Sequence, residues 1–324
     1  GAQDLSAALA GLAPPVRADV VSGPGDDAAV LRAGAGFQVI TTDHLRAFTD
    51  DAGLMARIAA IHAMGDVWAM GATPQAALAQ ITLPRMSPRM HSETLREIMA
   101  AAAEVFAAAG ADVVGGHTSV GTELTIGFTV TGLTGHITAK GGAVSGDALI
   151  LTKPLGTGTI LAAEMAHAHP DELMLGEAFA AALAQMTAAN GIAAAILAPH
   201  AHAMTDVTGF GLAGHLLEIL TASNCAATLT LGAIPLLPGA QSLAAAGIAS
   251  SLAPANRAAC TAQMTFTESP RAALLFDPQT AGGLLAAVSK TQATALIAAL
   301  RGQGVGAAMI GTLAAGPAHL TVTP

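Results

Sequence analysis

The chain has 324 residues, of which 52% are hydrophobic and only 3% aromatic, with one Trp and no Tyr. That length suits two ordinary domains, and their cores must be built from aliphatic side chains rather than from rings. The formal charge of −9 has the wrong sign for gripping nucleic acid through its phosphates, which excludes nucleic acid as the expected partner.

The mean hydropathy of +0.57 calls for a test of membrane segments. A spanning helix needs about 20 consecutive apolar residues, and the best candidate, Ala178 to Ala198, is interrupted by Gln185 and Asn190. The first residues show no basic patch followed by an apolar run, which argues against a signal peptide. Cys225 and Cys260 are isolated, so neither zinc nor a disulfide framework is predicted. We therefore expect a cytoplasmic protein with no membrane partner.

The first half of the chain alternates strand and helix patterns. Apolar residues recur at helical spacing after Asp51, and apolar and polar residues alternate from Leu124 to Val130, as in a strand with one buried face. The predicted elements in chain order are a strand over 36–42, a helix over 51–70, a strand over 75–83, a helix from Ser87 to Gly110, a short strand at Val113–Val114 and a strand over 124–130.

The second half repeats this mixture after a stretch, 134–147, that is rich in Gly, Thr, Ala and Ser. Such a composition is typical of a boundary, so we predict one domain over 1–140 and another over 141–324. The expected fold class is α+β in two lobes. The predicted elements are strands near 148–152, 226–231, 283–288 and 305–312, and helices near 157–168, 172–189, 209–222 and 290–301.

Aspartates gather in turns beside predicted strand ends or helix starts. Each of them alone is explained as an Asx-turn or N-cap residue, but in combination they fit Mg²⁺, which binds nucleotides through a few carboxylates and the phosphates. The clusters are Gly23-Pro24-Gly25-Asp26-Asp27, Thr41-Thr42-Asp43, Gly65-Asp66 and Thr205-Asp206-Val207-Thr208-Gly209.

Two further features have a functional and a plain structural interpretation. His62 and Asp66 share a helix face and can address one ligand, or His62 is simply a half-buried histidine. Gly115-Gly116-His117-Thr118 is expected to be a glycine turn between two strands, whose N–H groups can approach a phosphate. A P-loop or Rossmann site is disfavoured because G-x-x-x-x-G-K-[ST] and a complete dinucleotide fingerprint do not occur.

Across nearly the whole chain these clusters resemble the selenide, water dikinases of the aminoimidazole ribonucleotide synthetase-like superfamily. The first three segments below are shared with thiamine-phosphate kinases, whereas the last two, and Gly-Gly-His in place of Gly-Gly-Asp, point to the selenide branch. The segments are Asp26-Asp27-Ala28-Ala29-Val30, Thr41-Thr42-Asp43, Arg57 to Ala60 leading to Gly65-Asp66 and on to Gly71, Gly115 to Thr118, Leu151 to Gly156, Thr205 to Gly211, and Asp277 to Gly283.

The resemblance implies that ATP, selenide and water give selenophosphate, AMP and phosphate, with Mg²⁺ holding the nucleotide. Such chemistry needs positioning and charge neutralisation more than covalent catalysis. It further implies a homodimer whose N-terminal sheets pair across the two subunits, with composite sites because one segment reaches ATP from the neighbouring subunit. The residues implied are Asp27, Asp66 and Asp206 as magnesium ligands, Pro24, Gly25, Asp26, Asp43 and Asp66 as ATP contacts, and Gly116, His117 and Thr118 as contacts from the neighbour.

The chain departs from the family pattern at two places. Family members carry a glycine-rich N-terminal segment with a reactive Cys or selenocysteine and, three residues later, a Lys that touches ATP. Here the chain opens at Gly1-Ala2-Gln3-Asp4, so the catalytic residues are expected upstream of Gly1, and neither Cys225 nor Cys260 inherits the role. The second departure is His62, where the family more often has Asn.

The short lead before Asp26 and the variants at His62 and Gly115–Ser119 are similar to versions fused behind a flavin-dependent oxidoreductase, so such a fused N-terminal partner is one expectation. Two other functions stay open. A thiamine-phosphate kinase-like enzyme is favoured by Gly25-Asp26-Asp27-Ala28-Ala29-Val30 but not by Thr205–Gly211 or Asp277–Gly283. A non-catalytic nucleotide-binding paralogue is favoured by the absent Cys and Lys.

Overall fold

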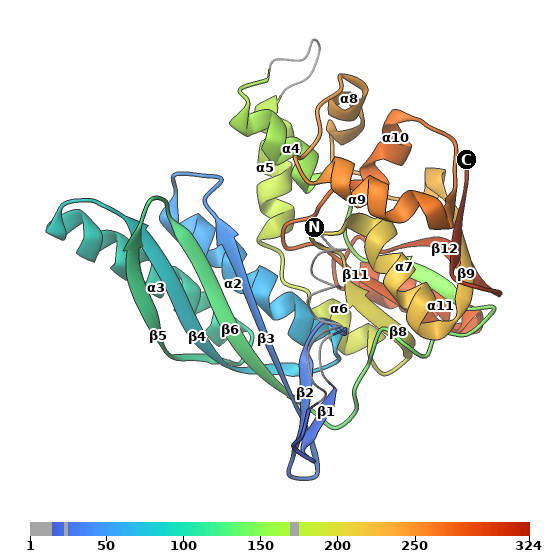
Figure 1. Cartoon of the computed structure of the whole chain (residues 1–324), viewed down its shortest axis with the longest axis horizontal. Coiled ribbons are helices and arrows are strands. Elements are labelled where there is room, and N and C mark those ends of the chain that lie inside the picture. Colours follow the sequence, from blue (N-terminus) through green and yellow to red (C-terminus); the bar gives the residue numbers. More distant parts are fainter. Residues whose placement is uncertain (1–14, 23–24, 169–174) are drawn as a thin grey trace. The chain divides into compact units, whose positions relative to one another are not determined.

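The computed structural model describes residues 15–22, 25–168 and 175–324. They form two compact units. The N-terminal unit consists of residues 15–137 and 187–191, and the C-terminal unit of residues 138–186 and 192–324. Each unit has its own sheet and helices (Figure 1).

The N-terminal unit contains a six-stranded sheet in the order β1-β2-β3-β6-β4-β5. Neighbouring strands are antiparallel except β4 and β5, which run parallel because the helix between them returns the chain to the same end of the sheet. The strands are β1 (Val20–Ser22), β2 (Ala29–Ala33), β3 (Gly36–Arg46), β4 (Thr73–Pro84), β5 (Asp112–Gly121) and β6 (Thr125–Thr134).

Helices α2 (Ala52–Ala69) and α3 (Pro88–Ala108) lie on one side of this sheet (Figure 1). Asp51 caps α2, its carboxylate accepting from the N–H of Leu54 at 2.8 Å, and Ser87 caps α3 in the same way. Helix α2 is buried along most of its length and packs on β3, β4 and β6, whereas α3 is amphipathic. The last turn of α2 is therefore held tightly against the middle of the sheet.

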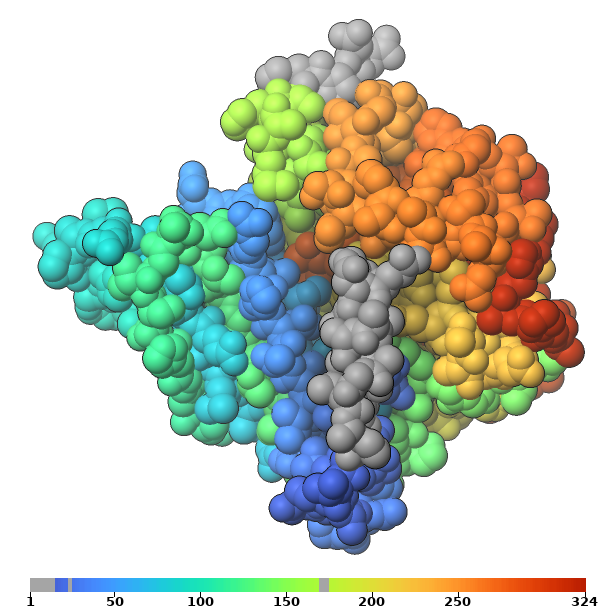
Figure 2. Space-filling model, viewed as in Figure 1, coloured from blue at the N-terminus to red at the C-terminus, as the bar shows by residue number. Residues whose placement is uncertain are grey.

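The other face of the sheet is left uncovered by α2 and α3. Along β4 the residues Ala77, Ala79 and Ile81 are buried, while the alternate positions Leu78 and Gln80 are exposed. Figure 2 shows side chains of these N-terminal strands at the molecular surface. Much of this open face is tied by polar pairs that cross the strands, namely Gln38 with Gln75 (3.1 Å), Thr42 with Thr129 (3.0 Å), Gln80 with Thr129 (3.1 Å) and Thr82 with Ser119 (3.0 Å).

The C-terminal unit contains a seven-stranded mixed sheet in the order β10-β13-β9-β12-β7-β11-β8. Strand β13 runs parallel to both β10 and β9, and the remaining neighbours are antiparallel. The strands are β7 (Ala148–Leu151), β8 (Ala201–Asp206), β9 (Cys225–Thr230), β10 (Met264–Thr265), β11 (Leu284–Val288), β12 (Ala308–Ala315) and β13 (His319–Thr323).

The core of this unit is aliphatic, with residues of α7 packed against β7, β9, β11 and β12. The helices are α4 (Thr157–Met165), α5 (Leu175–Met186), α6 (Gly191–Leu197), α7 (Gly211–Ser223), α8 (Ala240–Ala245), α9 (Ala253–Cys260), α10 (Pro270–Ala273) and α11 (Lys290–Gly302), with short 3₁₀ turns at η1 (Leu231–Ala233), η2 (Thr261–Gln263) and η3 (Leu274–Phe276). Among the described helices, none is by itself long and apolar enough to cross a bilayer; α5 and α6 reach that composition only as a pair bent by 56°.

The expected α+β fold class is confirmed, since helices and sheets are mixed in both units. The expected glycine turn at Gly115–Thr118 is wrong, because these residues lie inside strand β5 and pair in register with Leu78–Ile81 of β4. Gly116 is required for close strand contact, as a Cβ there would lie 2.1 Å from the carbonyl oxygen of Ala79. The helix expected over 172–189 ends at Met186, and α6 follows at an angle.

Candidate active site

Asp27 and Asp66 come together in the N-terminal unit. Asp27 lies two residues before the start of β2, and the pairing of β2 with β3 sets Ala29 opposite Ile40, next to Thr41. Asp66 lies in the last turn of α2, which packs on β3. One carboxylate oxygen of Asp27 lies within 4.8 Å of one of Asp66, and the hydroxyl of Thr41 donates to Oδ2 of Asp66. Both carboxylates are half-buried.

The other predicted residues of this unit lie on the same strands or beside them. Asp26 is half-buried and its Oδ1 accepts from the N–H of Asp27 at 3.0 Å, while the neighbouring Gly25 is exposed. Asp43 follows Thr41 by two positions on β3, so it points to the same face of the sheet. Pro24 lies outside the described residues.

His62 and the Gly116–Thr118 segment are placed differently. His62 lies one turn before Asp66 on α2 and is buried, with 9% exposure. Gly116, His117 and Thr118 are exposed on β5, the edge strand of the sheet. Exposure on an edge strand leaves them accessible to another molecule.

Asp206 belongs to the C-terminal unit, where it is the last residue of β8 and is 2% exposed. Lys153, which follows β7, is also buried, and its Nζ donates to the carbonyl oxygen of Ala281 at 2.8 Å. Burial lowers the pKa of Lys153 to about 7, and the negative charge of Asp206 partly offsets this effect. A buried carboxylate and a buried ammonium group are thus held in the same part of the sheet.

Gln279 links the three C-terminal segments that the sequence analysis singled out. Its Oε1 accepts from the N–H groups of Gly156 (2.9 Å) and Thr157 (3.2 Å) at the start of α4. Its Nε2 donates to the carboxylate of Asp277 at 2.9 Å, and its backbone N–H donates to the carbonyl oxygen of Thr208 at 2.9 Å. All three segments therefore share one buried hydrogen-bond network.

Asp277 is the acidic member of this network. Burial raises its pKa to about 6, although hydrogen bonds from Thr159 and Gln279 act in the opposite direction. Its Oδ1 accepts from the hydroxyl of Thr159 at 2.8 Å. A carboxylate and an amide from one loop thus satisfy the first turn of α4.

Neither cysteine has the surroundings of a reactive thiol. Cys225 and Cys260 are both buried and not joined in a disulfide. Burial raises the pKa of the Cys260 thiol to about 11, and the charge of Glu218 adds to the effect. Because the thiolate is the nucleophilic form, Cys260 is poorly suited to covalent catalysis at neutral pH.

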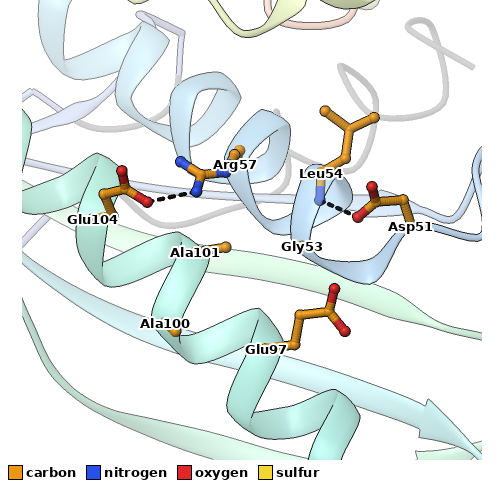
Figure 3. Close-up of a pocket in the computed structure, with 8 residues that line it drawn as sticks. All are labelled: Asp51, Gly53, Leu54, Arg57, Glu97, Ala100, Ala101 and Glu104. Carbon is orange, nitrogen blue, oxygen red and sulfur yellow. Dashed lines mark hydrogen bonds and ion pairs between the residues drawn. The ribbon is translucent and has the colours of Figure 1, made fainter.

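A separate pocket of about 440 Å³ lies between the start of α2 and the middle of α3 (Figure 3). Its charged side chains have structural partners: Asp51 caps α2, and Arg57 pairs with Glu104 at 2.5 Å. Glu97 reaches toward the first turn of α2 at Gly53. Among the residues that the structure describes, none of the predicted ATP contacts or metal ligands lines this pocket.

Comparison with known proteins identifies the relatives of this chain. Residues 25–134 match the family AIR synthase related protein, N-terminal domain, and residues 144–322 match its C-terminal domain. The selenide, water dikinase of Rhizobium meliloti is 39% identical over 308 residues, which cover 92% of this chain and 85% of the relative. That of Myxococcus xanthus is 36% identical over 332 residues, covering 99% and 92%. The chain belongs to the selenide, water dikinase family.

Solved structures support the same fold for this family member at lower identity. The protein tt0281 from Thermus thermophilus superimposes with a TM-score of 0.74 at 20% identity, covering 99% of this chain and 96% of that one. The HypE-HypF complex gives 0.73 at 17% identity, covering 100% and 96%. The thiamine monophosphate kinase of Aquifex aeolicus gives 0.66 at 17% identity, covering 91% and 90%.

Local sequence patterns do not reveal that Asp277 and Gln279 share a hydrogen-bond network with the start of α4, or that Lys153 donates to Ala281, although the segments that contain these residues carry the family resemblance. The sequence contained one sign of these close contacts, which is the high density of small residues around Lys153, Asp277 and Gln279. A Cβ on Gly282 would lie 1.8 Å from the carbonyl oxygen of Val207, and one on Gly283 would lie 2.5 Å from the backbone N of Lys153. Glycines of this kind mark backbones that pass in direct contact.

Proposed function

We propose that the natural protein makes selenophosphate from ATP, selenide and water, releasing AMP and phosphate. The observation that carries the proposal is the 39% identity of this chain to a selenide, water dikinase over 92% of its length. The residues quoted for the resemblance span both matched domains, from Asp26 to Gly283. This distribution over both domains supports the complete activity rather than nucleotide binding alone.

The proposal includes Mg²⁺ held by Asp27, Asp66 and Asp206. Within the N-terminal unit it is supported by carboxylate oxygens of Asp27 and Asp66 that lie within 4.8 Å of one another, because hard cations prefer such oxygen ligands. Asp206 is proposed as the third ligand from its position in the Thr205–Gly211 segment. When bound, Mg²⁺ neutralises negative charge on the phosphates. The protein supplies fixed carboxylates that orient the nucleotide.

We propose that residues 1–140 form one domain, which binds ATP and the metal ion and makes the dimer contact. Residues 141–324 form the proposed second domain. A glycine at position 25 allows the backbone to approach a phosphate closely. The proposed ATP contacts are Pro24, Gly25, Asp26, Asp43 and Asp66, together with Gly116, His117 and Thr118 of the neighbouring subunit.

A homodimer through the open sheet face is part of the same proposal. Leu78 and Leu133, which lie on this open face, are 45% and 43% exposed. Exposed apolar side chains gathered on one surface are typical of protein interfaces. The two buried cysteines, not joined in a disulfide, agree with a cytoplasmic location.

Phosphorus NMR of the natural full-length protein with ATP, Mg²⁺ and selenide tests the reaction. We expect selenophosphate, AMP and phosphate in equal amounts, and their formation should require both selenide and the cation. Thiamine phosphate added in a parallel sample should be left unchanged. Formation of ADP and thiamine diphosphate would instead favour a thiamine-phosphate kinase, and nucleotide binding without turnover would favour a non-catalytic paralogue. The sequence of the natural gene would test the expected fusion to an oxidoreductase.

A further inference from the structure

We infer that Thr41 is a positioning residue for Asp66, whose carboxylate its hydroxyl orients toward the cation. The inference rests on the proposed Mg²⁺ site and adds a residue that does not itself have to bind metal or nucleotide. Its starting point is the hydrogen bond from Oγ1 of Thr41 to Oδ2 of Asp66, which joins strand β3 to the last turn of α2. Thr41 is 9% exposed.

The donor is held rigidly. Thr41 lies in the middle of β3, which has β2 on one side and β6 on the other, and it stands opposite Val130 of β6. A β-branched side chain on a strand has few χ1 rotamers, so the position of the hydroxyl is largely set by the backbone. The alternate residue Thr42 points to the opposite face of the sheet, where it accepts from Thr129 at 3.0 Å.

The acceptor is also fixed by packing. Asp66 is followed by Val67, which is fully buried, and a Cβ on Gly132 of β6 would lie 2.4 Å from Cγ1 of Val67. The helix therefore approaches the sheet as closely as a glycine allows. With the helix backbone fixed, the remaining freedom of Asp66 is rotation of its side chain, and this rotation is restricted by the bond to Thr41.

Fixing that rotation has a direct consequence for cation binding. Carboxylates that ligate metal ions are usually held by outer hydrogen bonds, and removing such a partner typically weakens metal affinity by about 10–100-fold. A hydroxyl is suited to this role because it donates a hydrogen bond without adding a positive charge that would repel the cation. A carboxylate oxygen of Asp27 lies within 4.8 Å of one of Asp66, so the bond from Thr41 keeps the two carboxylates oriented as a pair.

Manganese binding to the full chain tests this inference, with the paramagnetic resonance of free Mn²⁺ as the readout. Thr41→Val removes only the hydroxyl and is expected to weaken Mn²⁺ binding by about 10–100-fold. Thr41→Ser keeps a donor and should restore most of the affinity. Thr42→Val removes a hydroxyl from the other face of the same strand and should leave the affinity unchanged. Asp66→Asn should weaken binding in any case.

The outcomes separate this inference from the proposed metal site. Thr41→Val with unchanged affinity, beside a weakened Asp66→Asn, would show that Thr41 is only a strand residue and would overturn the inference. Unchanged affinity in Asp66→Asn would overturn the metal site itself. Thermal melting with and without Mn²⁺ controls for folding. If Thr41→Val does not fold, Thr41→Cys, whose thiol is a weak donor, takes its place in the comparison with Thr41→Ser.

Discussion

The side-chain oxygen of Gln279 accepts a hydrogen bond at 2.9 Å from the backbone N–H of Gly156, which lies 123 residues earlier in the chain. Helix N-termini are usually capped by a side chain of the preceding residue. The residue in that position here is Gly156, which has no side chain, and its φ of +125° suits glycine. Gln279, which is distant in sequence, therefore caps the N-terminus of α4 in place of a local side chain.

Removing this cap should destabilise the protein more than removing an ordinary one. Gln279→Leu leaves the N–H groups of Gly156 and Thr157 buried without their acceptor, and each lost partner costs about 1–3 kcal/mol. We expect a total loss of about 2–6 kcal/mol in urea unfolding. Ser87→Ala removes the exposed cap of α3 and serves as the matched control, with an expected loss of about 1 kcal/mol. Equal losses in the two variants would contradict the assigned role.

Asp277 should make stability depend on pH. Its folded pKa of about 6 lies above the unfolded value near 4, so the folded state binds the proton more tightly between these values. Its stabilising contribution is complete below about pH 4 and is lost as the pH rises through about 6. Relative to wild type, the free energy of unfolding of Asp277→Asn should rise by up to about 3 kcal/mol as the pH is raised from 4 to 8. Chemical unfolding across this range measures the gain, and the exposed Asp50→Asn should show none.

Nucleotide binding should require a divalent cation, because Asp27 and Asp66 cannot approach a triphosphate without one between them. Calorimetry with a non-hydrolysable ATP analogue should show binding with Mg²⁺ and not with EDTA. Asp27→Asn should weaken binding yet leave the melting temperature of the metal-free protein unchanged or higher, since it removes one of two like charges. Glu123→Gln, an exposed carboxylate of the same unit, should change neither property. Equal affinity in EDTA would refute the metal assignment.

The open sheet face can be tested by introducing a charge. Leu78→Asp should convert a dimer into a monomer in light scattering, because an aspartate would be desolvated in the interface. Met309→Asp is the control, since Met309 is 47% exposed, nearly the same as Leu78 at 45%, but lies in the C-terminal unit. It should remain dimeric. A wild-type monomer at micromolar concentration with full ATP affinity would contradict the composite site.

Local patterns in the sequence predict the elements that carry a strong period. The strand around Leu124–Val130 is found because alternation reports one buried face, and β6 indeed spans Thr125–Thr134. Strand β8 is missed, since Ala201–Asp206 contains little apolar alternation and gains its place by pairing with β11. The glycines at 115 and 116 locally suggest a turn, whereas the structure requires glycine at 116 because its backbone passes close to Ala79 of another strand.

The candidate site likewise has residues that local sequence identifies and contacts that it does not. The aspartates stand out because they lie beside predicted strand ends or helix starts, so local reasoning selects them. The hydroxyl of Thr41 on Asp66 and the cap that Gln279 forms on α4 join residues far apart in sequence. Only the tertiary structure specifies which distant pairs meet.

The strand order of the C-terminal sheet also constrains how the chain can fold as it is synthesised. Every strand partner in the N-terminal sheet has been made once residue 134 has emerged. By contrast, β7 pairs with β11 and β12, and β8 pairs with β11, so neither has a partner in this sheet before residues 284–288 appear. A ribosome adding about 5–20 residues per second leaves these apolar strands waiting for several seconds. Protection of β7 during that interval, by a chaperone or by helices already made, would govern the yield of active protein.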